Sequence, residues 1–393
     1  MPVKKVIVEK ANRLYQLPPE IQSFVRPSGR RPLTRRTGVC DLATFRWPVD
    51  GDTAKQSQVA QFPPASKESL SRLKQELALW YAAAHRVKLN PAREVHIGGS
   101  ITTLVFNLAL AFIDNGDIAF VPDLGLPLYR KVITACGGES IGYSLRRRDD
   151  WRPGFERVGT RLGRVAKMLF LNSPHNPTGA ALTEKELTDL VWLAGRENIM
   201  IANDAAYQTV SEHQAVSLLS TTGGKKVGVE VGSFSYHFGL PSLPFGFVVG
   251  NAEMIAGLQL ASQFTPAFIP EAWIEMALAA LRQYPGEGIR AARRRIGQSR
   301  AEANKTMELL DLEKAGQDAV PFVWTRIERR SPATGEAGRL YRRGRILVTP
   351  GTAFGESGEG YLRFSLTAPP ESYRDACDRV KRGGRMVRLR KRK

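Results

Sequence analysis

Short apolar runs alternate with amphipathic stretches over most of the chain. The apolar runs lie at residues 95–98, 118–121, 168–171, 200–203, 227–234 and 245–249. Between them apolar residues recur at helical spacing, as in residues 184–198. Because strands that alternate with helices assemble into a mostly parallel sheet, this pattern predicts an α/β fold.

A helix with one buried face is predicted ahead of the first strand. Leu70, Leu73, Leu77 and Trp80 repeat at helical spacing. Ser66 precedes them, and serine is a favoured N-cap residue. The helix is therefore expected to begin just after Ser66.

The ends of the chain differ from its middle. The first fifty residues are rich in Arg and Pro and show little periodicity, which predicts an extended arm. After Ala272 a long helical stretch leads into a smaller region, where residues 319–327 and 345–349 are predicted strands. The expected division is an N-terminal arm contributing to the small domain (1–51), a large domain (52–285), a small C-terminal domain (286–380) and a basic tail (381–393).

Composition favours a globular protein with a large core. The chain has 393 residues, of which 42% are hydrophobic. No apolar run approaches the roughly 20 residues of a membrane span, and the N-terminus lacks the apolar core of a signal peptide. Cys40, Cys136 and Cys377 are widely separated, so they suggest packing residues and no metal site. A cytoplasmic location is expected.

The charge is strongly positive. Fifty-seven Lys and Arg residues against 38 Asp and Glu give a formal net charge of +19. Residues 381–393 include eight basic residues and no acid, and arginines cluster at 146–148 and 293–295. Two interpretations remain open: solvated faces with a basic tail, or contact with an anionic partner such as nucleic acid. No recognisable nucleic-acid motif accompanies the charge.

Polar and small residues follow several of the predicted strands. Open α/β sheets bind ligands at the carboxyl ends of their strands. The residues found there are expected to form one site, and they are Gly99, Ser100, Asn176, Asp204, Tyr207, Ser233 and Ser235.

Five ordered motifs carry a resemblance to a known family. They are V-P-D-L-G-L-P-L-Y (121–129), N-S-P-H-N-P-T-G (172–179), N-D-A-A-Y (203–207), S-F-S-Y-H-F-G-L (233–240) and G-Y-L-R-F-S (360–365). From Glu94 to Leu366 the chain resembles the class I/II aminotransferases, which are fold-type I pyridoxal phosphate (PLP) enzymes. The segment V-T-P-G-T-A-F-G (348–355) is most similar to the branch with LL-diaminopimelate and aspartate aminotransferases.

The resemblance implies a PLP-dependent transferase-like α/β fold, with a mostly parallel seven-stranded sheet, helices on both faces and a smaller α+β domain. It implies that Asp204 keeps the pyridine nitrogen protonated and that Tyr207 and Asn176 bind the phenolic oxygen of the cofactor. Arg363 would bind a substrate carboxylate as a bidentate fork. The implied phosphate cradle consists of Gly99, Ser100, Ser233 and Ser235. In the plain alternative, these residues cap or shape turns, and the arginine lies on the surface.

Three positions depart from the family pattern, and all three would touch the cofactor. Tyr236 stands where the family has the lysine that forms the Schiff base. Pro244 replaces the arginine that holds the phosphate, and Leu126 replaces the aromatic ring that stacks on the pyridine. Without the lysine, ordinary transamination should fail, because the lysine is both tether and base.

Two neighbouring residues are candidates for the missing proton transfer. Certain fold-type I sugar dehydratases use a histidine with pyridoxamine phosphate, and His237 is adjacent to the lysine position. Tyr236 could act as an acid or simply fill the volume of the lysine. The alternative for His237 is a packing or surface role without chemistry.

Three functions remain open. The first is an enzyme of aminotransferase fold that binds PLP, pyridoxamine phosphate or a preformed external aldimine non-covalently and acts on an amino-acid-like or carboxylated substrate. The second is a catalytically silent homologue that serves as a binding or regulatory module. The third is a cleft reassigned to non-PLP chemistry on another phosphate-bearing ligand. The resemblance also implies a homodimer.

Overall fold

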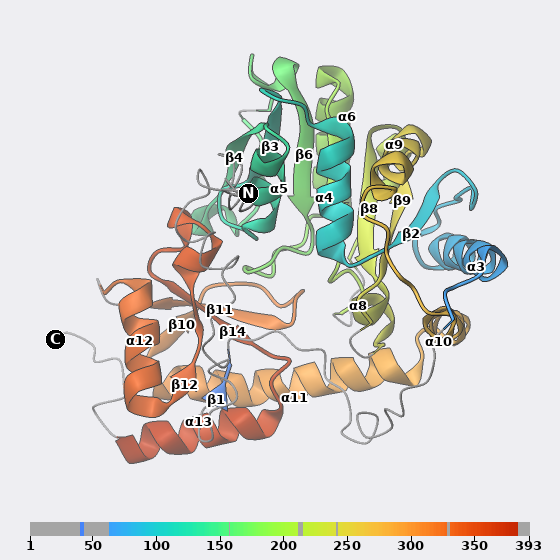
Figure 1. The fold of residues 1–393 in the computed structure, drawn as a ribbon. Helices are drawn as coiled ribbons and strands as arrows, with labels where there is room; N and C mark the ends of the chain where they lie inside the picture. Colours follow the sequence, from blue (N-terminus) through green and yellow to red (C-terminus); the bar gives the residue numbers. More distant parts are fainter. Residues whose placement is uncertain are drawn as a thin grey trace, which may run out of the picture. The chain divides into compact units, whose positions relative to one another are not determined.

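The larger sheet has eight strands in the described part of the chain, in the order β2-β9-β8-β7-β6-β3-β4-β5 (Figure 1). Neighbours from β4 to β8 pair in parallel, whereas β9 is antiparallel to both β8 and β2, and β5 is antiparallel to β4. The strands are β2 (Val95–Gly98), β3 (Ile118–Pro122), β4 (Glu139–Leu145), β5 (Pro153–Gly154), β6 (Ala166–Asn172), β7 (Met200–Asp204), β8 (Gly228–Ser233) and β9 (Gly246–Gly250). The prediction of a mostly parallel α/β sheet is confirmed. The resemblance implied seven strands, and the eight described strands include β5, a two-residue strand paired with the end of β4.

A computed structural model describes residues 40–42, 63–156, 158–210, 215–240, 243–327 and 331–383. The predicted arm and the predicted basic tail therefore lie almost wholly outside the described residues. All described residues belong to one compact unit. The division into domains 52–285 and 286–380 stays a prediction.

Helices cover both faces of the larger sheet because its strands alternate their side chains. Ala119 and Val121 of β3 pack in the cluster that contains helices α4, α5 and α9, whereas Phe120 packs with Leu187 of α6 on the other face. These helices are α4 (Ile101–Phe112), α5 (Leu128–Ala135), α6 (Glu184–Glu197) and α9 (Ala252–Ser262).

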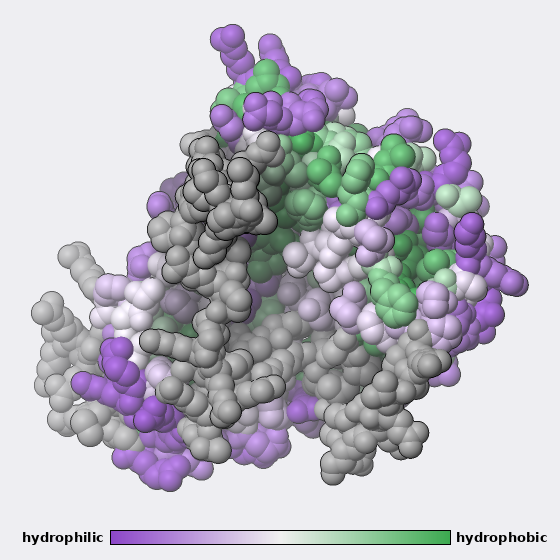
Figure 2. Space-filling view, viewed as in Figure 1, coloured by the Kyte–Doolittle hydropathy of each residue, from purple (hydrophilic) through white to green (hydrophobic). Residues whose placement is uncertain are grey.

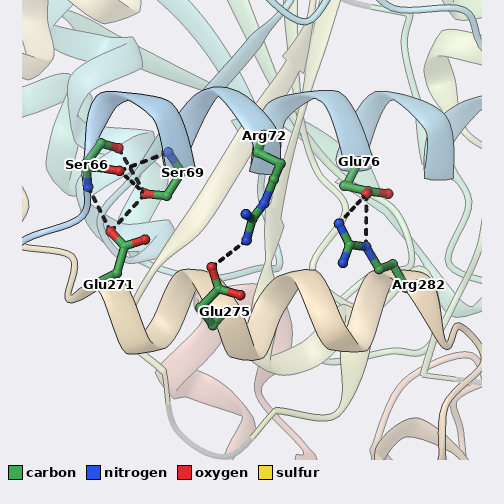
Figure 3. Close-up of polar contacts among 7 residues, drawn as sticks. All are labelled: Ser66, Ser69, Arg72, Glu76, Glu271, Glu275 and Arg282. Atoms are coloured by element: carbon green, nitrogen blue, oxygen red, sulfur yellow. Dashed lines mark hydrogen bonds and ion pairs between the residues drawn. The ribbon is translucent and has the colours of Figure 1, made fainter.

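Helix α3 (Lys67–His85) begins where the sequence predicts. The Ser69 N–H donates to the Ser66 hydroxyl oxygen at 3.0 Å, and Leu73, Leu77 and Trp80 are buried. The helix packs against α10 (Glu271–Arg282) through polar contacts along its length (Figure 3). These contacts join Ser66 and Ser69 to Glu271, Arg72 to Glu275 and Glu76 to Arg282.

A second, antiparallel sheet follows in the order β10-β11-β14-β13. Its strands are β10 (Leu312–Lys314), β11 (Phe322–Ile327), β13 (Thr349–Pro350) and β14 (Tyr361–Ser365). The helices packed around it are α11 (Glu287–Leu309), α12 (Ala333–Gly344) and α13 (Pro370–Gly383). Strand β1 (Cys40–Asp41) pairs in parallel with β12 (Ile346–Leu347), so residues far apart in sequence share this region.

Several element boundaries differ from the sequence prediction. The predicted strand at 227–234 starts at Gly228, because Val227 ends a short helix, α7 (Gly224–Val227), and Phe234 begins another, α8 (Phe234–Phe238). The predicted strand at 345–349 is split into β12 and β13. Strand β4 was not predicted, because its sequence E-S-I-G-Y-S-L mixes polar and small residues among the apolar ones.

Candidate active site

Polar side chains meet where adjacent strands of the larger sheet end. Asn172 at the end of β6 pairs with Asp204 at the end of β7, and β8, the next strand, ends at Ser233. The Asn172 side-chain amide donates to the Asp204 carbonyl at 2.8 Å. The same residue accepts from the Asn176 N–H at 2.8 Å, which draws the N-S-P-H-N-P-T-G loop to the strand ends.

The Asp204 carboxylate is buried and has donors within the chain. The Tyr129 hydroxyl donates to one carboxylate oxygen at 2.8 Å, and the Ala206 N–H donates to the other at 3.1 Å. Burial raises the pKa of Asp204 to about 6, although these two hydrogen bonds act in the opposite direction. A carboxylate has about four acceptor positions, so room for a further donor remains.

A continuous chain of contacts lies beside Asp204 and consists of Asn176, Tyr207 and Arg363. The Asn176 amide donates to the Tyr207 hydroxyl at 3.3 Å, and Arg363 Nη1 donates to the Asn176 oxygen at 3.0 Å. The Arg363 guanidinium lies 4.2 Å from the ring centre of Phe322 and 4.7 Å from that of Phe354. Burial lowers the pKa of Arg363 to about 10, so it stays a cation at neutral pH.

Tyr236 joins this group of residues. Its ring stacks on Tyr207, with ring centres 5.9 Å apart and planes inclined by 19°. Burial, and then the negative charge of Asp204, raise the pKa of Tyr236 to about 12. At neutral pH its phenol is therefore protonated, and it can donate a proton but has none of the basicity of a free lysine amine.

His237 points into a different region. Its ring is fully buried against Trp80 and Phe247, with ring centres 6.0 and 5.2 Å away, in the core cluster beneath α3. Burial, and then the neighbouring His85, lower its pKa to about 3. These contacts favour the packing role among the two that the sequence leaves open.

The small residues proposed as a phosphate cradle lie at the ends of β2 and β8, the two strands that flank β9. Gly98 of β2 and Ser233 of β8 both pair with Gly246 of β9. Gly99, which comes after β2, therefore lies on one side of β9, and Ser235, which comes after β8, lies on the other. The Ser235 hydroxyl donates to the Leu243 carbonyl at 2.8 Å. The Ser100 hydroxyl caps α4 by accepting from the Thr103 N–H at 3.3 Å. Both hydroxyls thus already have partners within the chain.

Two residues at this site had no role in the sequence analysis, although both stand inside quoted motifs. Tyr129, the donor to Asp204, is the last residue of V-P-D-L-G-L-P-L-Y. His175, within N-S-P-H-N-P-T-G, bonds through Nδ1 to the Thr178 hydroxyl at 2.8 Å and through Nε2 to the Leu124 carbonyl at 2.9 Å. Burial lowers the pKa of His175 to about 4, so a neutral imidazole joins the two motif loops.

Comparison with known proteins identifies the family of this chain. The family model for aminotransferase class I and II matches residues 51–380. This chain belongs to the class I and II aminotransferase family. It is 28% identical to an LL-diaminopimelate aminotransferase of Moorella thermoacetica over 95% of this chain and 98% of the relative.

Solved structures of the family have the same fold. A substrate-bound BacF structure from Bacillus subtilis has a TM-score of 0.82 at 23% identity and covers 96% of this chain and 98% of its own. An aspartate aminotransferase double mutant from Thermus thermophilus has a TM-score of 0.81 at 21% identity, with 96% and 100% covered. The fold-type I assignment made from the motifs is therefore confirmed.

Members of this aminotransferase family use pyridoxal phosphate and act on amino-acid substrates. The spare acceptor capacity of the buried Asp204 fits a pyridine nitrogen, so the residues present fit this cofactor at that end. Among the described residues, no group of three or more His, Cys, Asp or Glu side chains is placed to hold a metal ion. No helix in that part of the chain is long and apolar enough to cross a membrane.

Proposed function

We propose that this chain is a divergent aminotransferase-fold enzyme that binds PLP or pyridoxamine phosphate without a covalent bond to lysine. Its substrate would be amino-acid-like or carboxylated. The observation that carries the proposal is Tyr236, which stands at the lysine position of the S-F-S-Y-H-F-G-L motif and stacks on Tyr207 beside Asp204.

The cofactor, when bound, supplies an electron sink, and the residues of this chain divide the remaining tasks. Asp204 would hold the pyridine nitrogen, and Asn176 with Tyr207 would bind the phenolic oxygen. Arg363, held by Asn176, is a buried cation that suits a substrate carboxylate. Tyr236 would serve as a hydrogen-bond donor toward the reacting atoms, because a phenol with a pKa of about 12 keeps its proton at neutral pH and is a weak acid there.

Cofactor affinity should be low compared with a lysine-bearing relative. A missing charge-assisted hydrogen bond to the phosphate, at Pro244, costs about 1.5–3 kcal/mol. A missing stacking ring, at Leu126, costs about 0.5–1.5 kcal/mol more. The hydroxyls of Ser100 and Ser235 offset little of this loss while they remain bonded within the chain.

A second candidate function is a catalytically silent binding or regulatory module. It is favoured by the Tyr129–Asp204 hydrogen bond, which satisfies the buried carboxylate without any ligand. A third candidate, non-PLP chemistry on another phosphate-bearing ligand in the same cleft, has no contact of its own in its favour.

We also propose a homodimer. Large apolar side chains are exposed on α4, on α9 and in the segment after α9, and apolar residues gather in this area in Figure 2. Leu260 is 64% exposed, Phe264 82% and Phe268 64%. A patch of this kind is typical of a surface that a partner covers. Its segment also approaches the cradle, since a Cβ on Gly99 would lie 3.4 Å from Ala267.

Absorbance and borohydride trapping test the enzyme proposal. Titration of the purified protein with pyridoxamine phosphate, read as difference absorbance in the near ultraviolet with the cofactor present, should show saturable binding that weakens when Asp204 is replaced by Ala. Borohydride treatment with PLP should leave no pyridoxyl adduct on a lysine of the site. A protein that binds neither cofactor favours the silent module, and a trapped lysine would overturn the proposed non-covalent mode.

A further inference from the structure

An open hollow of about 730 Å³ is lined by residues of α3, of β2, of α9 and of the segment between α3 and β2. Helix α3 and helix α9 lie near the sheet edge that β2 forms (Figure 1). Lys67, Ser71 and Lys74 line the hollow from one face of α3, at the spacing of successive helical turns. Its other polar lining comes from Gln75, Asn90, His96 and Gln259. None of these residues belongs to the candidate active site.

The charge in this hollow has one sign. Two of its lining residues are lysines, and no Asp or Glu is among the described residues that line it. Burial, and then the Lys74 ammonium, lower the pKa of His96 to about 4, so that ring is neutral at physiological pH. The hollow is therefore cationic and also offers hydroxyl and amide hydrogen-bond donors.

Lys74 has no acidic partner among the described residues, whereas several other lysines do. Lys167 pairs with Asp117 at 3.0 Å and Lys225 with Glu94 at 2.8 Å. Lys74 is half-buried yet forms no ion pair with any residue that the structure describes, and burial is the cause of its lowered pKa. A partly desolvated cation without a counter-charge is unfavourable, and a bound anion would remove that penalty.

We propose that this hollow is a second ligand site, which binds a small molecule through an oxyanion, a phosphate or a carboxylate, with Lys74 as the main charged partner and Lys67, Ser71 and Gln259 as additional donors. Leu70 and Ile97 in the same lining would contact an apolar body of the ligand. The net charge of +19 would favour the approach of anions to such a site. The proposal does not depend on the function of the strand-end site.

Chemical modification of lysine gives a readout at the hollow itself. The intact protein is acetylated under limiting reagent in sodium chloride, with inorganic phosphate in one arm and succinate in another at matched ionic strength. Mass spectrometry then compares Lys74 with Lys185, an exposed lysine of α6 that pairs with Asp189. A bound anion should slow acetylation of Lys74 several-fold and saturably, whereas simple screening would change both lysines alike.

Matched variants test whether the slower acetylation of Lys74 reflects affinity for the anion. Lys74→Met removes the charge but keeps most of the side-chain volume, and it should weaken phosphate or succinate binding, measured by calorimetry, by about tenfold or more. Lys74→Arg should retain much of the binding, and Lys185→Met should leave it unchanged. Whichever anion binds more tightly, phosphate or succinate, identifies the ligand class. Equal acetylation of Lys74 with and without both anions, or equal affinity in the Lys74→Met and Lys185→Met variants, would overturn the proposal.

Discussion

The strand-end site and the hollow beside α3 solve the problem of buried charge in different ways. At the strand ends, Asp204 is bonded to Tyr129 and Ala206, and Arg363 is bonded to Asn176. In the hollow, the charge of Lys74 faces a lining without an acid. The hydrogen bonds at the strand ends offset part of the cost of burying charge while that site is empty, whereas Lys74 has no counter-charge among the described residues to offset its own cost. An anion bound in the hollow would supply that counter-charge.

The largest expected effect, a gain of PLP binding, comes from placing a lysine and an arginine at the strand-end site. The triple variant Tyr236→Lys, Pro244→Arg and Leu126→Tyr should turn yellow with PLP, because it restores the tether, the phosphate contact and the stacking ring. Visible absorbance before and after dialysis measures the gain. Adding Asp204→Ala should abolish or strongly shift the band. A folded triple variant that stays colourless with excess PLP would mean that this cleft serves another ligand.

Asp204 itself should destabilise the empty protein at neutral pH. Its pKa in the folded chain, about 6, exceeds its ordinary value of 3.8, so the folded state binds more protons in that interval and the contribution of Asp204 to stability falls as pH rises through it. Asp204→Asn should therefore raise the free energy of unfolding at pH 7.5 by on the order of 2 kcal/mol relative to wild type.

Urea unfolding at pH 7.5 and at pH 4 tests whether the charge of Asp204 destabilises the folded protein. The gain from Asp204→Asn should shrink at pH 4, where the wild-type carboxylate is largely protonated too. The exposed Asp189→Asn serves as the matched control, since that carboxylate lies on the surface of α6. A gain of equal size at both pH values would show that the substitution acts through packing and not through the charge.

A smaller effect is expected in the hollow when no ligand is added. Lys74→Met should stabilise the protein by about 0.5–1 kcal/mol in chloride buffer, because it removes a half-buried charge that water still screens in part. With phosphate present, wild type should become more stable than the variant, since wild type would gain binding free energy that the variant lacks. Melting temperatures with and without phosphate measure both changes. A variant that phosphate stabilises as much as wild type would contradict the contrast between the two sites.

The smallest effect should come from the opposite face of the same helix. Arg72 pairs with Glu275 across α3 and α10, and both side chains are about half exposed (Figure 3). Exposed ion pairs contribute about 0–1 kcal/mol, so Arg72→Met should lower stability by no more than about 0.5 kcal/mol. Chemical denaturation with and without phosphate should give the same small loss. A loss well above this value would mean that the α3–α10 contacts, and not Lys74, dominate the energetics of this helix.

Much of the fold followed from the sequence, because its main signals are local. Apolar runs bounded by turn residues located β2, β3 and β7, and Ser66 located the start of α3. Strand β4, which lies between β3 and the two-residue edge strand β5, was not predicted because its sequence mixes polar and small residues among the apolar ones and so lacks a continuous apolar run.

The motif residues lie at the strand ends, but the sequence did not show how they are paired. Tyr129 and Asp204 are 75 residues apart, and no periodicity signals their hydrogen bond. Adjacent positions also diverge in space: Tyr236 stacks on Tyr207, whereas His237 is buried against Trp80. One step along the short helix α8 rotates a side chain by about 100°, and the tertiary packing decides which residue faces the site.

The imidazole of His175 has a consequence for how this half of the site can evolve. It bonds to the Leu124 carbonyl in one loop and to Thr178 in its own, so an insertion or deletion in either loop would break contacts of the other. The two loops thus form one inherited unit, whose lengths are constrained together. Side chains on such a unit remain free to change, and new specificity is expected to arise by substitution there, not by remodelling of the loops.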